Sequence, residues 1–511
     1  MKSTEPLILS LDIGTTALKV GLFSSEGGLL HIESSEQELL FLSEDRVEQS
    51  PHKTWSLLTR AVQKSVAGYE PRLIKAISLS IQRGTVVPLD HDGNPLSDQV
   101  VWMDKRGVQL THRMNELIGN APYYDVSGHP ITYITGVSKL LWFQQQGGQI
   151  WNKLKVIAPP QTLWLKWLGC EELVCDRSLG TYLFPCDIDH KEWSNELANR
   201  LNFPIDHLPK LVDATEIVGY LSKQTAQEMN LVPGIPLVAG GGDGQCAGIG
   251  CGIVEPGSVM VNIGTGTGVQ AYLSSPLRDP LRIINCAAHV DPQGWEMEGH
   301  TEASGIAFKW LRDQLGDMET LLQRKTDLDA FDLLILESQD VPPGSNGLIF
   351  YPTFNGMIAP IIDQNARATI VGLNLHHQRK HLIHALLEGI SLEIRWILDA
   401  INKAGVQIDT VHLVGGGSKN RIWNQMHTDI LNKPIKTLLT TDAALVGAAM
   451  CGAVAIGEYE NIQAASQNFV KIKETIEPIK ENADIYEKIF LKYRKIFIAL
   501  SENHIFRDII N

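Results

Sequence analysis

The sequence lacks long hydrophobic runs, paired cysteines and an excess of positive charge, and each absence excludes a class of protein. No stretch of about 18 or more uncharged apolar residues occurs, so we expect no membrane-spanning helix. The seven cysteines are odd in number and form no C-x-x-C pair, which argues against a disulfide framework or a zinc ribbon. Lys and Arg (44) are outnumbered by Asp and Glu (58), and the formal net charge of −14 argues against binding to nucleic acid or anionic membranes.

The start of the chain also lacks the features of an export signal. Met1–Pro6 contains no basic segment, and the apolar run Leu7–Leu11 is too short for a signal peptide. Together with cysteines that we expect to be reduced, this predicts a cytoplasmic protein. What the chain does contain is an ordinary globular composition, with 44% hydrophobic and 20% charged residues over 511 positions. That length predicts two or three domains with sizeable cores.

A strand–turn–strand unit near the N-terminus recurs near the middle of the chain. Apolar β-forming residues flank Gly14–Thr16 in the segment Leu7–Phe23, and the same arrangement surrounds Gly264–Gly268 in the segment Val259–Tyr272. The two turns are separated by about half of the chain length, so we expect two structurally related α/β halves.

We place the boundary between these halves after residue 248, giving domains 1–248 and 249–511. No low-complexity linker separates them, so we expect the two domains to abut and to enclose a cleft. Capping residues and apolar spacing predict helices that start near Ser50-Pro51 and that cover His381–Ala400, Ala443–Ile456 and Tyr486–Leu500.

Two Gly/Thr turns are candidate phosphate sites. In Asp12-Ile-Gly-Thr-Thr16 and in Gly264–Gly268, small residues allow backbone N–H groups to approach an anion, and Thr hydroxyls add donors. Asp12 could hold Mg²⁺ through water beside such a phosphate. Either turn alone could be a plain hairpin turn, but two of them facing each other across a cleft would hold a polyphosphate from both sides.

A third glycine-rich segment, Gly240–Gln245, carries Asp243 at the end of a predicted strand. A carboxylate exposed there is well placed to act as a general base, although a D-G turn without function has the same pattern. Gly242-x-Gly244-x-x-Ala247 also matches a loose dinucleotide-binding fingerprint. The acidic residue expected about 20 positions later is missing, which disfavours an NAD-dependent dehydrogenase.

A fourth segment, Leu413–Asn420, runs from a strand through glycines into the predicted helix Arg421–Leu431. This arrangement suits a nucleotide at a helix N-terminus, with Ser418 as the expected N-cap, and no P-loop motif occurs in the chain. Four histidines are spaced like metal ligands, but neighbouring Arg and Lys residues favour a solvated helix face; they are His376, His377, His381 and His384.

The four segments, in this order and over nearly the whole chain, resemble the FGGY carbohydrate kinases. The motifs that carry the resemblance are Leu11-Asp-Ile-Gly-Thr-Thr16, Asn262-Ile-Gly-Thr-Gly266, Val414–Asn420, Gly447-Ala-Ala449, Gly372–Ile390, Val47-Glu-Gln49 with Trp55, and Val101–Arg106. The resemblance implies the actin/hexokinase/Hsp70 fold, that is, an α/β protein of two duplicated ribonuclease H-like domains with a cleft between them. It also implies ATP-dependent phosphorylation of a small sugar, with Mg²⁺ and ATP as cofactors.

The resemblance further implies roles for individual residues. Asp243 would be the catalytic base, and Asp12 would lie near Mg²⁺ and contact it through water. The residues expected to bind the nucleotide are Asp12, Gly14, Thr15, Thr16, Gly264, Thr265, Gly266, Gly416, Gly417 and Asn420. The residues expected to contact the substrate are Gln82, Arg83, Trp102, Asp104, Asp243 and Gln245.

The expected substrate is inferred from positions at which members of this family differ from one another. Glycerol kinases carry Arg-Glu where this chain has Arg83-Gly84, and the Met-His pair usual in xylulokinases is missing, yet the tail Ile485–Lys495 resembles pentulose kinases. We therefore expect a ketopentose such as xylulose, with glycerol or another polyol as the alternative. A nucleotide-gated regulatory protein on the same fold is the alternative of another class. Many relatives are dimers or tetramers, so a homodimer is also considered.

Overall fold

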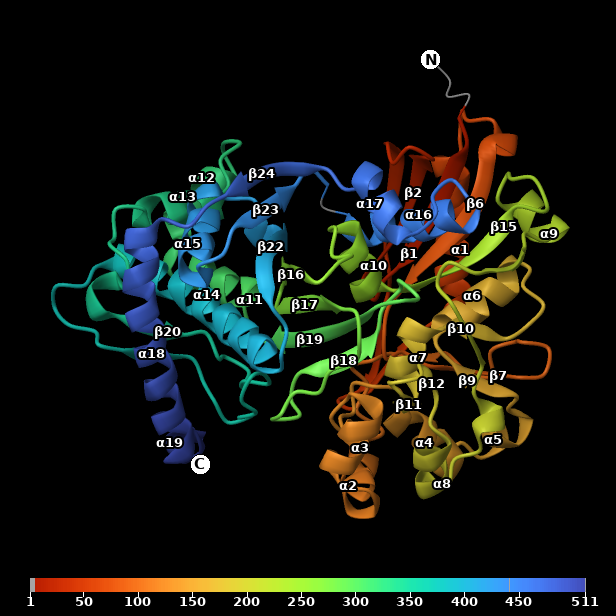
Figure 1. The fold of residues 1–511 in the computed structure, drawn as a ribbon, viewed down its shortest axis with the longest axis horizontal. Helices are drawn as coiled ribbons and strands as arrows, with labels where there is room; N and C mark the ends of the chain where they lie inside the picture. Colours follow the sequence, from red (N-terminus) through yellow and green to blue (C-terminus); the bar gives the residue numbers. More distant parts are fainter. Residues whose placement is uncertain (1–4, 441, 511) are drawn as a thin grey trace.

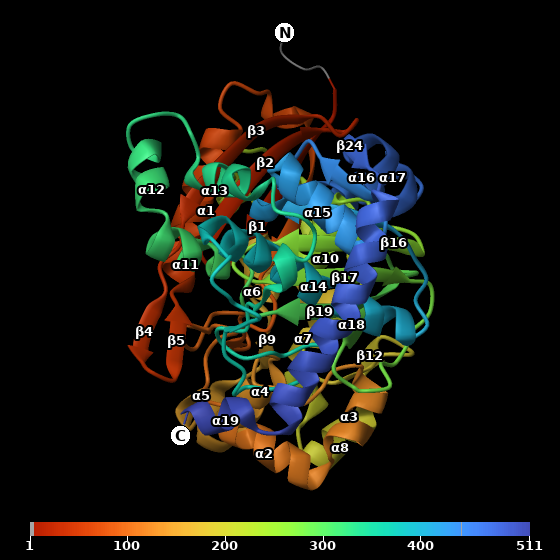
Figure 2. The same cartoon turned by 90° about the vertical axis from the view of Figure 1, so that its left-hand side faces the viewer.

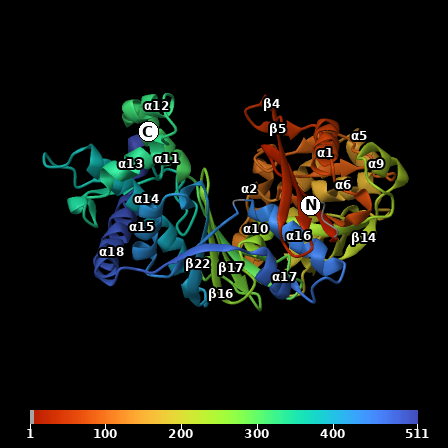
Figure 3. The ribbon, with the colours of Figure 1, turned by 90° about the horizontal axis from the view of Figure 1, so that it is seen from above.

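The computed structural model describes residues 5–440 and 442–510, which form two α/β lobes around two large sheets (Figure 1). Viewed from above, the lobes lie side by side, with the helices α11–α15 and α18 in one and α1, α6 and α9 in the other (Figure 3). Within the described residues, no helix is long and apolar enough to cross a membrane.

The N-terminal lobe is built on a six-stranded sheet with the order β14-β15-β6-β1-β2-β3. Strand β1 runs antiparallel to β2 and parallel to β6, which in turn runs parallel to β15. Their apolar residues are buried on both faces, as expected for strands covered by helices. The strands are β1 (Leu7–Ile13), β2 (Ala17–Ser24), β3 (Leu29–Glu36), β6 (Ile74–Ile81), β14 (Ile217–Tyr220) and β15 (Pro236–Gly242).

The C-terminal lobe repeats this arrangement in a seven-stranded sheet with the order β18-β19-β17-β16-β22-β23-β24. Strand β16 takes the place of β1, being antiparallel to β17 and parallel to β22, which pairs in parallel with β23. An antiparallel strand closes the edge in both lobes, β14 in one and β24 in the other. The prediction of two related α/β halves is therefore confirmed. The strands are β16 (Gly257–Ile263), β17 (Thr267–Leu273), β18 (Asn285–Ala288), β19 (Trp295–Thr301), β22 (Ile408–Gly415), β23 (Ile435–Leu438) and β24 (Ile472–Ile476).

Helices α16 (Ala443–Ala455) and α17 (Ile462–Phe469) lie on the N-terminal sheet although they come late in the chain (Figure 1). Helix α16 packs against β1 and β6 and crosses α10 (Asp243–Gly250), the helix that follows the third glycine-rich segment. The crossing is close because two glycines meet it: a Cβ atom at Gly447 would lie 1.9 Å from the carbonyl oxygen of Cys246, and one at Gly250 would lie 1.9 Å from that of Ala443. The domain boundary after residue 248 stays a prediction.

Three of the long helices, α1, α14 and α18, lie close to the ranges that the sequence predicts. Helix α1 (Pro51–Ser65) begins directly after the N-cap Ser50, as predicted. Helix α14 covers Arg379–Lys403, and α18 covers Lys480–Glu502, starting six residues before the predicted Tyr486. Helices α14, α15 (Arg421–Leu431) and α18 pack together in the C-terminal lobe (Figure 2).

Smaller elements cover the sheets, and those around α2, α3, α4 and α8 extend the N-terminal lobe downward in the view of Figure 1, where α7 contacts β18 of the C-terminal lobe. The remaining strands are β4 (Leu40–Ser43), β5 (Arg46–Gln49), β7 (Val87–Leu89), β8 (Gln99–Val100), β9 (Val156–Ala158), β10 (Val174–Asp176), β11 (Cys186–Asp187), β12 (Glu192–Trp193), β13 (Lys210–Val212), β20 (Ile349–Tyr351) and β21 (Thr369–Val371). The remaining α-helices are α2 (Val108–Leu117), α3 (Asn120–Ser127), α4 (Val137–Gln146), α5 (Gln149–Lys153), α6 (Pro160–Leu168), α7 (Arg177–Leu183), α8 (Asn195–Leu201), α9 (Lys223–Glu228), α11 (Gly305–Leu315), α12 (Asp317–Gln323), α13 (Ala330–Ser338) and α19 (Ile505–Ile510).

Two local predictions were wrong. The N-cap of α15 is Asn420, whose carboxamide oxygen accepts hydrogen bonds from the amides of Ile422 and Trp423, because the chain turns into the helix two residues after Ser418. His381 and His384 do not lie on a solvated helix face. Both are buried in α14, and the described residues contain no group of three or more His, Cys, Asp or Glu side chains that could hold a metal ion.

Candidate active site

A cavity of about 430 Å³ lies where the two sheets face each other. Strand β1 and its turn border it from the N-terminal lobe, strands β16, β17 and β19 border it from the other lobe, and the start of α10 lies at its side. Its lining residues are Asp12, Gly14, Arg83, Asp243, Gly244, Ala247, Met260, Asn262, Gly264, Gly266, Thr267, Gly268, Glu298, His300, Thr301 and Ala444. The cavity therefore brings together three of the four glycine-rich segments.

The two Gly/Thr turns are structural counterparts of each other. Each connects an Ile at the end of one strand to the next strand through three residues, and each is closed by a hydrogen bond from the amide of its first glycine: from Gly14 to Ala17, and from Gly264 to Gly266. Within the described residues, four further turn amides donate no hydrogen bond; they belong to Thr15, Thr16, Thr265 and Gly266. Unpaired N–H groups in a glycine-rich turn are the donors that bind phosphate oxygens.

The first turn is held in place by a side-chain network. Thr15 Oγ1 donates to Gln82 Oε1 at 2.9 Å and accepts a hydrogen bond from Trp102 Nε1 at 3.0 Å. Gln49 Nε2 donates to the carbonyl oxygen of Thr15 at 3.0 Å and accepts from Gln82 through its own Oε1. Gln82 and Trp102 thus position the turn, whereas Thr16 is exposed.

Asp12 stands at the end of β1, beside Ser80 on the neighbouring strand β6. Ser80 Oγ donates to Asp12 Oδ1 at 2.7 Å, and the other carboxylate oxygen of Asp12 has no partner within the described residues. Burial raises the pKa of Asp12 to about 7; the hydrogen bond from Ser80 opposes this shift, and the nearby carboxylate of Asp243 adds to it. A carboxylate in this state is stabilised by a cation.

Asp243 is the first residue of α10 and follows directly on β15. Its Oδ1 atom lies 3.2 Å from Arg83 Nε and accepts a hydrogen bond from the amide of Gly244 at 2.8 Å. Its side chain keeps 38% exposure, so the carboxylate is open to the cavity. Desolvation raises the pKa of Asp243 above its ordinary value, and the guanidinium group of Arg83 partly offsets that shift.

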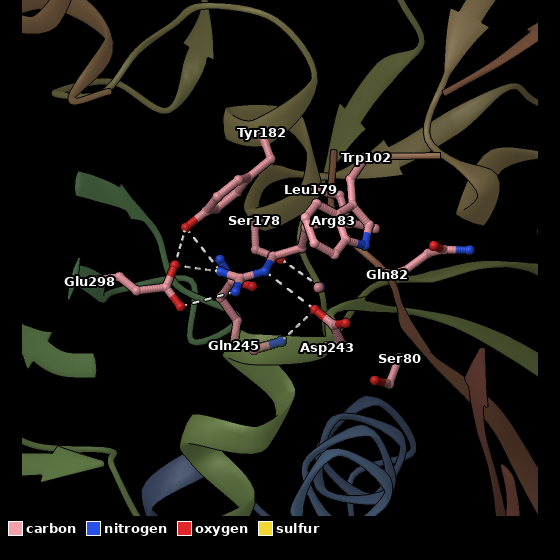
Figure 4. Close-up of polar contacts among 12 residues, drawn as sticks. Ser80, Gln82, Arg83, Trp102, Ser178, Leu179, Tyr182, Asp243, Gln245 and Glu298 are labelled. Atoms are coloured by element: carbon pink, nitrogen blue, oxygen red, sulfur yellow. Dashed lines mark hydrogen bonds and ion pairs between the residues drawn. The ribbon is translucent and has the colours of Figure 1, made fainter. Parts of the chain in front are cut away.

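Arg83 connects Asp243 to the C-terminal lobe (Figure 4). Its two Nη atoms donate to Glu298 on β19 at 2.7 and 2.9 Å, which is a bidentate pair. Nη1 also donates to the hydroxyl of Tyr182 at 2.9 Å, and that hydroxyl donates to Glu298. Sequence reasoning missed Glu298 and Tyr182. The alternation Glu296-x-Glu298-x-His300 places three polar groups on one face of β19 and was the available signal.

Four of the six predicted substrate residues do not line the cavity. Gln82 and Trp102 hold the first turn, and the other two, Asp104 and Gln245, are bound to protein groups elsewhere. Asp104 is fully buried, and its carboxylate accepts hydrogen bonds from the amide of Val47 and from Arg106, so its contacts are structural. Gln245 is also fully buried and donates to Glu296 at 2.7 Å behind Asp243. Arg83 and Asp243, by contrast, both line the cavity.

The fourth glycine-rich segment lies at the end of β22, next to β16, and does not line this cavity. Gly416 is exposed and Gly417 is buried against Ile263. Asn420 caps α15 through its oxygen and donates through Nδ2 to Asp332 at 2.6 Å, so its side chain is engaged by the protein.

Comparison with known proteins agrees with this geometry. The N-terminal domain model of the FGGY family of carbohydrate kinases matches residues 7–250, and the C-terminal domain model matches residues 259–456. A gluconokinase of Bacillus subtilis (strain 168) is 28% identical over 495 residues, which cover 97% of this chain and 95% of that protein. A xylulose kinase of Staphylococcus epidermidis is 26% identical over 500 residues, which cover 96% and 97% of the two chains.

Solved structures show the same fold. The ligand-bound xylulose kinase from Lactobacillus acidophilus superposes with a TM-score of 0.89 at 23% identity, covering 97% of this chain and 98% of that one. The Plasmodium falciparum glycerol kinase with ADP gives a TM-score of 0.86 at 21% identity, with the same coverage. Two family models that together span most of the chain, and a cavity between two repeated lobes, lead to one conclusion: the chain belongs to the FGGY family of carbohydrate kinases and is an ATP-dependent sugar kinase.

Proposed function

We propose that the chain transfers the γ-phosphate of ATP to a hydroxyl group of a neutral sugar, with a ketopentose such as xylulose as the first candidate, and that Asp243 is the base. The observation that carries this proposal is the position of Asp243, which opens into the cavity beside Arg83 while two turns with unpaired amides border the same cavity. Function in the cytoplasm and assembly into a homodimer remain predictions from the sequence.

Asp243 would accept the proton of the substrate hydroxyl as its oxygen attacks the γ-phosphate. Desolvation raises the pKa of Asp243, which makes its carboxylate a better proton acceptor than a solvated one. Arg83 keeps the group ionised and fixes its direction. Phosphoryl transfer asks little covalent chemistry of the protein, so one positioned base can be sufficient.

The phosphates would lie between the two turns. Amide groups from Thr15 and Thr16 on one side and from Thr265 and Gly266 on the other could donate hydrogen bonds to phosphate oxygens. The protein carries net charge −14, so neutral backbone donors suit this task better than a basic surface would. We assign the adenosine to Gly416, Gly417 and the neighbouring Asn420 by family resemblance.

The residues around Asp12 fit a magnesium ion. Its second carboxylate oxygen, which has no hydrogen-bond partner within the described residues, is a hard ligand of the kind Mg²⁺ prefers. Burial raises the pKa of this carboxyl, and a cation beside it would favour the ionised form. Asp12 would hold the ion directly or through water. When bound, Mg²⁺ would offset charge on the transferring phosphate.

The charge of the cavity favours a neutral acceptor over an aldonate. Its lining includes the carboxylates of Asp12, Asp243 and Glu298. Among the residues that the structure describes, Arg83 is the one Lys or Arg side chain in this lining, and it is already paired with Glu298 and Asp243. A carboxylate on the substrate would meet like charges with no free cation to pair with. The gluconokinase relative keeps gluconate as the competing candidate.

A panel of acceptors tests this proposal. Production of ADP from Mg-ATP is measured with D-xylulose, glycerol, D-gluconate and no acceptor, using Asp243→Asn protein as a background control. We expect D-xylulose to stimulate turnover most strongly. D-gluconate as the best acceptor would contradict the electrostatic argument. If none of a broad range of ketoses, polyols and aldonates stimulates turnover, a nucleotide-gated regulatory role is favoured instead.

A further inference from the structure

The base Asp243 is held by a group from the opposite lobe, through one arginine. Arg83 follows β6 of the N-terminal lobe, and Glu298 lies on β19 of the C-terminal lobe, 215 residues further along the chain. The two Nη atoms of Arg83 bind Glu298, and its Nε atom faces Asp243 (Figure 4). The two carboxylates therefore share one cation.

The surroundings leave this guanidinium group little freedom. The ring of Tyr182 lies under it, with Arg83 Cζ 4.5 Å from the ring centroid. Glu298 is itself fixed by Gln270 Nε2 at 3.1 Å and His300 Nε2 at 3.2 Å, and only 3% of the residue is exposed. A planar group with its donors engaged and one face covered has a single orientation.

The glycines on either side of the base make room for the same side chain. A Cβ atom at Gly244 would lie 2.6 Å from Arg83 Nη2, and one at Gly242 would lie 2.3 Å from Gln245 Oε1 and 3.0 Å from Arg83 Cδ. Neither glycine has a backbone conformation that requires glycine, because neither has a positive φ. The close passage of Arg83 beside Asp243 thus explains Gly244, whereas Gly242 is restricted by Gln245 as well as by Arg83.

From this geometry we infer that Glu298 is a positioning residue for the phosphoryl transfer. It orients Arg83 and takes up part of its charge, and so keeps Asp243 in one rotamer and basic enough to accept a proton. The inference rests on the proposed role of Asp243. It also links the base to the relative position of the lobes, because Glu298 and Asp243 sit on opposite lobes.

The charges around Glu298 determine its protonation state and that of its neighbour Glu296. Burial alone would raise the pKa of Glu298, but Arg83 and His300 hold it well below its ordinary value, so this carboxylate is ionised. Its neighbour Glu296 has a strongly raised pKa, caused by burial and by the charge of Glu298. The charged or titratable groups near Asp243 are Arg83, Glu298 and Glu296, with Asp12 across the cavity and Tyr182 and His300 around Glu298.

Neutralising Glu298 would leave the full charge of Arg83 to Asp243. In Glu298→Gln, the pKa of Asp243 should therefore fall, so the acidic limb of the kcat–pH profile moves to lower pH by about one unit. The weaker base should also lower the kcat plateau by about tenfold. Glu298→Asp keeps the charge but shortens the side chain, so its acidic limb should stay near that of the wild type while kcat falls.

The experiment measures kcat–pH profiles with Mg-ATP and the acceptor that ranks first in the panel. Glu388→Gln is the matched control, because Glu388 is equally buried but lies in α14 and contacts Ser345 and Tyr486 instead of the cavity. The inference predicts that the acidic limb of the kcat–pH profile is displaced in Glu298→Gln but not in Glu298→Asp or Glu388→Gln. Identical profiles for all of these variants and the wild type, or equal displacement for Glu298→Gln and Glu298→Asp, would overturn it.

A second variant covers the case in which Glu298→Gln fails to fold. Gly244→Ala adds a methyl group on the other side of the guanidinium group, at a helical position where alanine is favourable. We expect the methyl group to displace the guanidinium group from its bonds with Glu298, which lowers the melting temperature of a still folded protein and lowers kcat at least tenfold; a wild-type kcat would count against the inference. If Asp243→Asn retains activity, the proposed base is wrong. If that variant is inactive while the limb of Glu298→Gln is unmoved, only the present inference fails.

Discussion

Replacing Gly447 with alanine sets two opposing effects against each other at the crossing of α10 and α16. Gly447 lies in the middle of α16, where alanine is intrinsically more favourable in a helix by about 1 kcal/mol. The added Cβ atom, however, would lie 1.9 Å from the carbonyl oxygen of Cys246 and 2.6 Å from its carbonyl carbon. Both atoms belong to the backbone of α10, so no side-chain rotation can relieve the overlap.

The packing effect should be the larger one. Normal van der Waals contact requires the two helices to separate by more than 1 Å, which would disturb the buried contacts of α16 with β1 and β6 and those of α10 with β15 and β6. Overpacking of a core costs about 1–3 kcal/mol, and contact with a rigid backbone lies at the upper end of that range. After subtraction of the helix propensity, we expect Gly447→Ala to destabilise the protein by about 2 kcal/mol.

Thermal and guanidinium-induced unfolding, followed by circular dichroism, measures this change. Gly248→Ala is the matched control in the partner helix, because the nearest atom to its added Cβ is the end of the Gln270 side chain, at 3.1 Å. That variant should unfold within experimental error of the wild type or at slightly higher denaturant. If Gly447→Ala is as stable as Gly248→Ala or more stable, the close crossing of α10 and α16 is refuted.

Two further variants separate catalytic from structural carboxylates. The folded-state pKa of Asp12 is about 7, above its ordinary value of 3.8. Between about pH 4 and 7 the folded protein therefore keeps a proton that the unfolded chain loses. The free energy of unfolding consequently falls as pH rises through this window. The melting temperature of Asp12→Asn should therefore rise above that of the wild type as pH increases across that window, and its advantage should be constant at higher pH. Its kcat should fall at least tenfold. A difference in melting temperature that does not depend on pH would contradict the raised pKa. Asp104→Asn should lose about 3 kcal/mol of stability, because it breaks the buried pair with Arg106, yet keep the KM for the acceptor within twofold. A large rise in KM would instead support the predicted contact of Asp104 with the substrate.

Much of the fold could be predicted because its signals are local. The Gly/Thr turns stand between continuous apolar strands, so the sequence alone indicates both repeated units. The position of α16 on the opposite lobe could not be predicted, since it depends on backbone contacts between Gly447 and Cys246 that no periodicity encodes.

The candidate site likewise contains residues that the sequence indicates and residues that it does not. Asp12 and Asp243 stand out because each ends a strand beside glycines, and the structure brings both to one cavity. The partner of Arg83 is 215 residues away, so only the alternation along β19 hinted at Glu298. Asp104 was placed with the substrate by resemblance, whereas its burial depends on contacts with Val47 and Arg106 that appear only after folding.

The central claim is that Asp243 accepts the proton of the substrate hydroxyl. The most direct test compares kcat of Asp243→Asn with that of the wild type at saturating Mg-ATP and acceptor, together with the affinity for ATP. The amide keeps the size of the side chain but cannot take up a proton, so kcat should fall by at least about a thousandfold while the Kd for ATP stays within about twofold. A kcat within tenfold of the wild type would show that another group removes the proton.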